Sequence, residues 1–183
     1  MAEETKYGKY FVSEPIPREG AKGFGRLPQT VLWTDNDVVP GSLLFWAFRM
    51  GSSYVAPPHG PHTHKDPEVL VILGTNPDDP YDLGGAEIDI YMGPEMEKHT
   101  ITKSTLVYIP ANFLHCPIYY RNVEKAKYPF IFIQSQYAPK LTEKSYKKLA
   151  KESERDGMVF FDLDGKQTDE ELDRQRGQRK TKY

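Results

Sequence analysis

The sequence predicts an all-β domain built as a sandwich or barrel. Short apolar or alternating runs recur between turn residues, and no helical pattern separates them. Runs of this length, rich in β-branched and aromatic residues, are typical of strands. In Glu87–Tyr91 the apolar residues alternate with the others, as a strand with one buried face requires. The runs are Leu43–Met50, Val69–Leu73, Ala86–Met92, Thr100–Ile109 and Phe130–Tyr137, and closely spaced strands of this kind favour a sandwich or barrel.

Three regions differ in composition. Residues 1–30 are polar and rich in proline and glycine, which predicts an extended N-terminal arm. Residues 31–139 carry the strand pattern and show no internal repeat, so we expect one barrel. Residues 140–183 begin with Thr142 as a cap and with Tyr146, Leu149 and Ala150 near helical spacing. We therefore expect one C-terminal helix, followed by a short apolar run and a polar tail.

The composition narrows the function classes. Lys and Arg number 24 against 26 for Asp and Glu, so we expect neither a nucleic-acid nor a membrane partner. The single cysteine, Cys116, excludes an internal disulfide and fits a reducing compartment. Residues 1–20 lack a signal-peptide pattern, and no apolar window approaches the ~18 residues of a membrane span. A cytoplasmic protein is expected.

Four residues form a pattern typical of a metal site. His62 and His64 are two apart, so on a strand both rings leave one face, about 6.6 Å apart along the chain. Glu68 has the same parity, although Pro67 interrupts the strand, so it is expected from the start of the next one. His115 follows a turn far downstream. Imidazole and carboxylate together suit Fe, Mn, Ni, Cu or Zn better than Ca or Mg; Asp66 is an alternative carboxylate.

At these positions the chain resembles the cupin family. The first cupin motif is matched by His62, His64, Glu68 and Gly74, and the second by Pro110 and His115. Asn112 stands in place of the turn glycine, which is tolerable because Asn accepts positive φ. Two further departures, Ala56 and Ser104, stand where the motifs open with glycine. The resemblance implies a jelly-roll β-barrel over about 31–139, with one divalent transition metal held by His62, His64, Glu68 and His115.

Several other residues are candidates for the substrate pocket. His59 stands on a turn before the ligand pair, and Arg49 lies in a run that is apolar on both faces, so its direction is open. Tyr119 and Gln134 are pocket candidates by strand parity. By the same parity Cys116 points away from the metal as a small buried thiol. His99, after a charged turn, is expected at the surface.

The resemblance leaves the reaction open. Cupins include dioxygenases, decarboxylases, isomerases and lyases that act on small oxygen-rich molecules, and a fold does not fix a reaction. We expect first an iron-dependent dioxygenase acting on a small aromatic or enolisable molecule, mainly because that activity is common among cupins. The aromatic residues are compatible with a planar substrate and equally with core packing. Redox-neutral chemistry, with Glu68 or a pocket residue moving a proton, and a non-catalytic binding barrel are the alternatives. A homodimer is also expected, because Leu43–Met50 is apolar on both faces.

Overall fold

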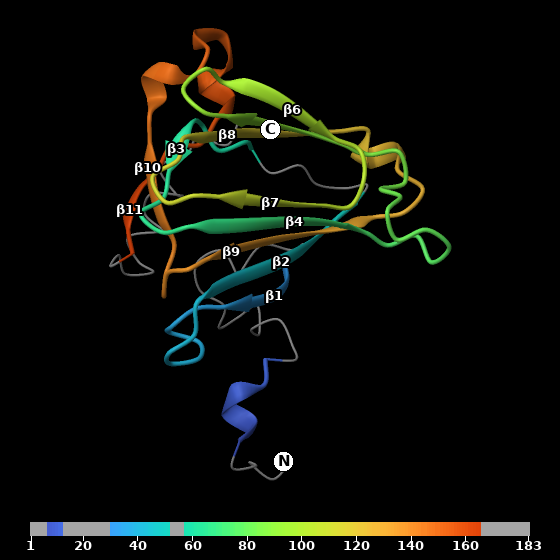
Figure 1. Cartoon of the computed structure of the whole chain (residues 1–183), viewed down its shortest axis with the longest axis vertical. Coiled ribbons are helices and arrows are strands. Elements are labelled where there is room, and N and C mark those ends of the chain that lie inside the picture. The colour runs from blue at the N-terminus through green and yellow to red at the C-terminus, as the bar shows by residue number, and fades with distance from the viewer. Residues whose placement is uncertain (1–6, 13–29, 52–56, 166–183) are drawn as a thin grey trace.

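A computed structural model describes residues 7–12, 30–51 and 57–165. Two antiparallel sheets face each other and enclose the core, which confirms the predicted jelly-roll architecture (Figure 1). The five-stranded sheet has the order β1 (Thr30–Thr34), β2 (Leu44–Met50), β9 (Phe130–Gln136), β4 (Glu68–Gly74) and β7 (Thr105–Ile109). The six-stranded sheet has the order β11 (Asp162–Asp164), β10 (Thr142–Ser145), β3 (His62–Thr63), β8 (His115–Arg121), β5 (Glu87–Met92) and β6 (Glu97–Ile101).

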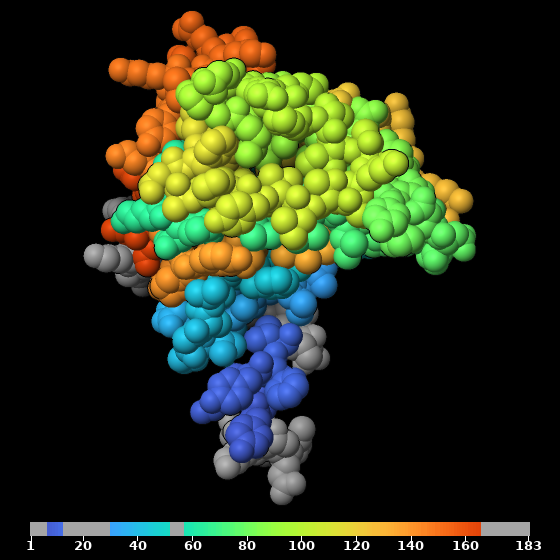
Figure 2. Space-filling view, in the orientation of Figure 1, coloured from blue at the N-terminus to red at the C-terminus, as the bar shows by residue number. Residues whose placement is uncertain are grey.

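The strands fall close to the runs predicted from the sequence. β2, β4, β5 and β9 each lie within one residue of the expected ends, because each carries the apolar alternation that a buried face needs. The expected run Thr100–Ile109 belongs instead to two strands, the end of β6 and the whole of β7. Figure 2 shows both strands as yellow-green residues on the upper face of the molecule.

The core between the sheets has two parts. The larger cluster fills the middle of the barrel and includes Phe130 and Phe132 of β9, Leu70 and Ile72 of β4, and Ile88 of β5, all at most 3% exposed. The smaller cluster joins residues of β1 and β2 to residues near the C-terminal end of the described part: Trp33, Leu44, Trp46, Val159, Phe161 and Leu163. The C-terminal apolar run therefore completes the barrel instead of packing outside it.

The segment expected to form one C-terminal helix has a different structure. Thr142–Ser145 is strand β10, which pairs with β3 and β11. Two 3-10 helices follow, η4 (Lys147–Leu149) and η5 (Glu152–Gly157). Pairing with the sheet overrides the weak helical spacing here, because tertiary contacts outweigh local propensity in short segments.

The remaining described helices are η1 (Gly8–Tyr10), at the blue end of Figure 1, and η3 (Val123–Lys125). Most of the expected N-terminal arm and the tail after residue 165 lie outside the described residues. Among the helices of the described part, none is both long and apolar enough to span a membrane.

Candidate metal centre

The four predicted ligands meet at one end of the space between the sheets. His62 lies on β3 and pairs directly with His115, the first residue of β8. Glu68 opens β4 on the facing sheet, beyond the break at Pro67, as the sequence indicates. The centroids of the three imidazole rings lie 4.4 to 5.0 Å apart. All four side chains are buried, at 3% exposure or less.

The turn before His115 is held by Asn112. Its φ is 60°, so the asparagine does adopt the left-handed conformation that the motif's glycine provides. Its backbone N–H donates to the carbonyl of His64 at 2.7 Å. This bond ties the turn that carries His115 to the segment that carries His64, and so fixes two of the candidate ligands relative to each other.

Backbone carbonyls orient the three histidines in the same way. Nδ1 of His62 donates to the carbonyl of Gly60 at 2.7 Å, and Nδ1 of His115 donates to that of Phe113 at 3.1 Å. Nδ1 of His64 donates to the carbonyl of Thr142. With Nδ1 protonated, Nε2 of each neutral ring keeps its lone pair, which is the form that binds metal.

The Nε2 atoms of His64 and His115 provide the test of whether a metal fits. Among the described residues they are the buried side-chain nitrogens and oxygens without a hydrogen-bond partner. Leaving such an atom unpaired costs about 1–3 kcal/mol. Oε2 of Glu68 lies 3.4 Å from Nε2 of His64 and 3.2 Å from Nε2 of His115. A carboxylate and two imidazoles aimed at one point fit a divalent transition metal.

Glu68 is held from behind by β9. Nε2 of Gln134 donates to Oε1 of Glu68 at 2.6 Å, which leaves Oε2 directed at the histidines. Burial alone would raise the pKa of Glu68, but the neighbouring His64 and His115 lower it well below its usual value. The carboxylate is therefore ionised and ready to ligate.

A second carboxylate, Glu143 of β10, lies behind the histidines. Oε2 of Glu143 accepts from Nδ1 of His59 at 2.7 Å, and its Oε1 accepts from Oγ of Ser145 at 2.9 Å. Oε1 is also 3.8 Å from Nδ1 of His62. Burial would raise the pKa of Glu143, but the neighbouring His62 and His59 lower it to about 2. Burial in turn lowers the pKa of His62 to about 3, against the attraction of Glu143.

No sequence pattern indicated a role for Glu143, because it lies in the segment expected to be helical. Gln136, which is fully buried and whose Nε2 lies 3.5 Å from Oε1 of Glu68, could have been found. It has the same parity on β9 as Gln134, so its side chain enters the barrel from the same face.

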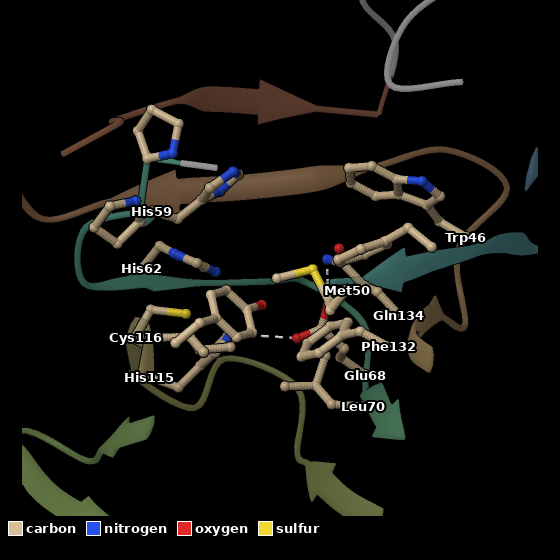
Figure 3. Close-up of a pocket in the computed structure, with 15 residues that line it drawn as sticks. Trp46, Met50, His59, His62, Glu68, Leu70, His115, Cys116, Phe132 and Gln134 are labelled. Atoms are coloured by element: carbon tan, nitrogen blue, oxygen red, sulfur yellow. Dashed lines mark hydrogen bonds and ion pairs between the residues drawn. The ribbon is translucent and has the colours of Figure 1, made fainter. Parts of the chain in front are cut away.

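A cavity opens beside His62, Glu68 and His115, and its walls are largely apolar and aromatic (Figure 3). The five-stranded sheet supplies most of these walls, and β8 supplies the opposite one. The lining residues are Trp46, Phe48, Met50, Pro57, Pro58, His59, His62, Glu68, Leu70, His115, Cys116, Ile118, Tyr120, Phe132 and Gln134. His59 and Gln134 lie where the sequence hypothesis put them. No lysine or arginine is among the described residues that line the cavity.

Arg49 does not belong to this cavity. On β2 the side chains of Trp46, Phe48 and Met50 face inward, so the odd-numbered Arg49 points outward, opposite Ile131 of β9. It is exposed to solvent, and the hypothesis that it binds an anionic substrate group in the pocket is wrong.

A β-bulge in β8 corrects two further expectations. His115 pairs with Met92 and Ile118 with Ile90, so two residues of β8, Cys116 and Pro117, oppose one of β5. Such a bulge reverses the inward and outward alternation beyond it. Cys116, whose φ is 69°, therefore faces the cavity together with His115 instead of pointing away.

Beyond the bulge, Ile118 and Tyr120 line the cavity. Tyr119 points to the other side, where its hydroxyl donates to Glu154 at 2.6 Å, so its assignment to the pocket is wrong. Burial and the bond to Glu154 raise the pKa of Tyr119.

The other candidates lie away from the centre. His99 of β6 has a side chain that is 53% exposed and lies 3.2 Å from Glu97, as expected of a surface residue. Asp66 is half-buried, and among the described residues it joins none of the clusters whose atoms could surround one ion. Glu68, not Asp66, is the carboxylate that faces the histidines.

The two-sheet topology is that of a double-stranded β-helix, the fold of the cupins, and the histidine–glutamate cluster fits a cupin metal site. No protein-family model matches the chain, and no curated protein matches it. The comparison with solved structures finds chains of low sequence identity.

Three of these structures illustrate the comparison. An oxalate oxidase in complex with the substrate analogue glycolate is 12% identical, with 76% of this chain and 64% of that chain covered and a TM-score of 0.42. Peruvianin-I, a cysteine peptidase from Thevetia peruviana latex, is 14% identical, with 79% and 81% covered and a TM-score of 0.42. The DMSP lyase DddQ from Ruegeria pomeroyi DSS-3 is 13% identical, with 76% and 64% covered and a TM-score of 0.40. These likenesses are low, and they carry no argument about the activity of this chain.

Proposed function

We propose that the protein is a metal-dependent cupin enzyme that acts on a small, largely apolar or aromatic molecule, with dioxygen as co-substrate. The observation that carries the proposal is that His62, Glu68 and His115 line an aromatic cavity without lysine or arginine in its described lining, with the ring of His64 next to those of His62 and His115. Iron is our first choice of metal; Mn, Ni, Zn and Cu suit the same ligands.

The ligand count supports a catalytic site. Three imidazoles and one carboxylate would occupy four positions of a six-coordinate ion and leave two for other ligands, and a cavity lies beside three of these residues. An open position distinguishes a catalytic from a structural metal. When bound, the ion supplies Lewis-acid polarisation of a substrate oxygen and, if it is iron, a place for dioxygen.

The lining indicates the substrate class. Trp46, Phe48 and Phe132 form one aromatic wall, with ring centroids 4.8 to 4.9 Å apart between neighbours. Flat apolar walls bind a planar, apolar body and exclude water. With no cation in the described lining, the ion is the group that receives a substrate oxygen. A phenol or enol is therefore favoured over a dicarboxylate or a sugar phosphate, whose additional charges would have no partner.

Two polar groups in the cavity position the substrate. Gln134 is held by its bond to Glu68 and lines the wall beside the ligands. His59 is held by Glu143, and its side chain is 30% exposed at the cavity. A histidine oriented by a buried carboxylate is an arrangement that can hold a substrate proton.

This pair favours one alternative, redox-neutral chemistry in which the metal holds the substrate and a pocket residue moves a proton, as in a decarboxylase, isomerase or lyase. The test is a screen of the iron-loaded protein for oxygen uptake with planar phenols and enolisable diketones, repeated under strict anaerobiosis. Uptake that follows substrate loss supports the dioxygenase. Equal substrate loss without oxygen supports the redox-neutral enzyme. Tight binding without turnover by any metal form supports a non-catalytic barrel.

A further inference from the structure

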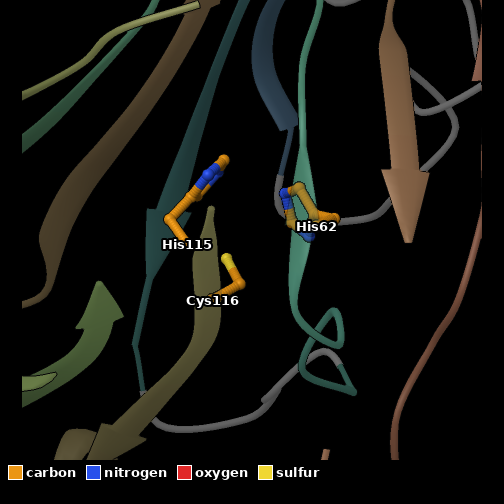
Figure 4. A group of neighbouring side chains, drawn as sticks. All are labelled: His62, His115 and Cys116. Atoms are coloured by element: carbon orange, nitrogen blue, oxygen red, sulfur yellow. The ribbon is translucent and has the colours of Figure 1, made fainter. Parts of the chain in front are cut away.

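Cys116 lies closer to the candidate metal centre than strand alternation allows. The bulge in β8 turns its side chain into the cavity beside that of His115 (Figure 4). Sγ of Cys116 and one ring nitrogen each of His62 and His115 lie within 4.8 Å of one another. All three side chains are buried, at 4% exposure or less. Three groups that can each offer a ligand atom therefore lie together.

An independent observation shows that this point calls for a ligand. Nε2 of His115 is buried and has no hydrogen-bond partner. His115 also belongs to the cluster with His64 and Glu68. His115 is therefore shared by two clusters, one that contains a carboxylate and one that contains a thiol.

We propose that Cys116 is a fifth protein ligand of the same ion, which makes the centre a mixed nitrogen, oxygen and sulfur site. This inference rests on the proposed metal centre and goes beyond the three-histidine and one-glutamate set. On binding, a sulfur–metal bond forms, and the thiol proton passes to solvent.

A sulfur ligand changes which metals fit and how much room remains. Thiolate favours Zn, Co, Cd and Fe, whereas Mg and Mn prefer oxygen ligands. Five protein ligands would leave one position of a six-coordinate ion, so a substrate oxygen and dioxygen could bind the ion together only if one protein ligand were displaced. If Cys116 served only as a small apolar side chain, neither consequence would follow.

The test uses Co²⁺, whose bond to thiolate produces a near-ultraviolet charge-transfer absorption that nitrogen and oxygen ligands do not. Cys116 is the only cysteine of the chain, so the wild-type spectrum alone identifies the ligand. We expect the band at one Co²⁺ per chain in the full-length protein. Cys116→Ser should lose the band and still bind Co²⁺ through the remaining four ligands.

Met50→Leu is the matched control, because Met50 is the other sulfur-bearing residue of the cavity lining and is 2% exposed. This variant should keep the band. Wild-type protein that binds one Co²⁺ without the band overturns the inference and leaves the metal centre standing. A band that survives Cys116→Ser overturns it as well. Failure of the wild type to bind Co²⁺, Zn²⁺ or Fe²⁺ overturns the proposed centre itself, and with it this inference.

Discussion

Glu68→Gln separates the charge of the candidate ligand from its shape. Nε2 of Gln134 donates to Oε1 of Glu68, so in the variant the amide oxygen must keep that position. The amide nitrogen is then forced to face Nε2 of His64 and His115, where Oε2 lies in the wild type. An amide N–H₂ donates hydrogen bonds and does not ligate a metal. The variant should therefore fold and lose one ligand completely.

The expected effect is large enough to measure by thermal unfolding. Metal at about 100 times its Kd stabilises the wild type by ~2.7 kcal/mol, which corresponds to ~5–11 °C in Tm for a chain of this size. Changing only the partner behind a ligand costs ~10–100-fold in affinity, so we expect loss of the ligand itself to cost about 100-fold or more. At the same metal concentration the variant then gains at most ~0.4 kcal/mol, or ~1–2 °C.

Without metal, the variant should unfold within a few degrees of the wild type. It removes a buried charge, and its amide can donate to ring nitrogens that have no partner in the wild type. Asp66→Asn is the matched control and should keep the whole metal-dependent shift. If metal stabilised the Glu68→Gln protein as fully as the wild type, Glu68 would not be a ligand, and Asp66 would become the candidate carboxylate.

The same variant tests whether Glu68 is also a base. If it is only a ligand, activity per chain falls in parallel with bound metal, which is the result we expect. A base would instead show activity per bound metal reduced ~10²–10⁴-fold. Measuring metal content and rate on the same sample distinguishes the two roles.

Three further predictions concern stability and assembly. Burial would raise the pKa of Asp89, but bonds from Arg121, Lys98 and Thr100 lower it from 3.8 to about 2. The contribution of ionised Asp89 to the free energy of unfolding is therefore complete above about pH 4 and is lost as the pH falls toward 2. In urea titrations Asp89→Asn should lower the free energy of unfolding by ~1–2 kcal/mol at pH 7 and leave it unchanged near pH 2. An equal decrease at both pH values would contradict this linkage. Phe132→Ala, at a core position 2% exposed, should cost ~3–5 kcal/mol in the same assay, and a cost below ~1 kcal/mol would show that this core is not closely packed. Leu106 is 62% exposed on the outer face of the five-stranded sheet, so we expect a homodimer in sedimentation that Leu106→Glu weakens; a wild-type monomer at micromolar concentration would refute it.

The strands and the four candidate ligands could be predicted because their signals are local. Alternation along a strand fixes which residues face inward. His62, His64 and Glu68 have the same parity and are close in sequence, so a single turn between the two strands is enough to bring their side chains together. Asn112 was predictable for the same reason, since its conformation depends on its own side chain.

The bulge in β8 could not be derived from alternation, because parity arguments assume an unbroken strand. Because of one extra residue, Cys116 faces the cavity and Tyr119 faces away from it, the reverse of what parity predicts. Pro117 was the available signal, since proline inside a sheet is confined to edges and bulges. The direction of Arg49 was open for a different reason: both faces of its run are apolar, and only the pairing with β9 decides between them.

Glu143 was missed because its role depends on partners far along the chain. Thr142–Ser145 pairs with β3, some 80 residues earlier in the sequence, and only that pairing brings Glu143 to His59 and His62. The local pattern, with Tyr146, Leu149 and Ala150 near helical spacing, indicated a helix instead. Long-range pairing of this kind leaves no periodicity to detect.

The central claim is that His62, His64, Glu68 and His115 hold one divalent ion per chain, and elemental analysis of purified protein measures this most directly. We predict one transition-metal ion per chain after reconstitution, most of it lost in His62→Ala and His64→Ala and all of it retained in His99→Ala, whose histidine lies at the surface. Full metal occupancy in both ligand variants, or a wild-type protein that takes up no ion, would contradict the claim.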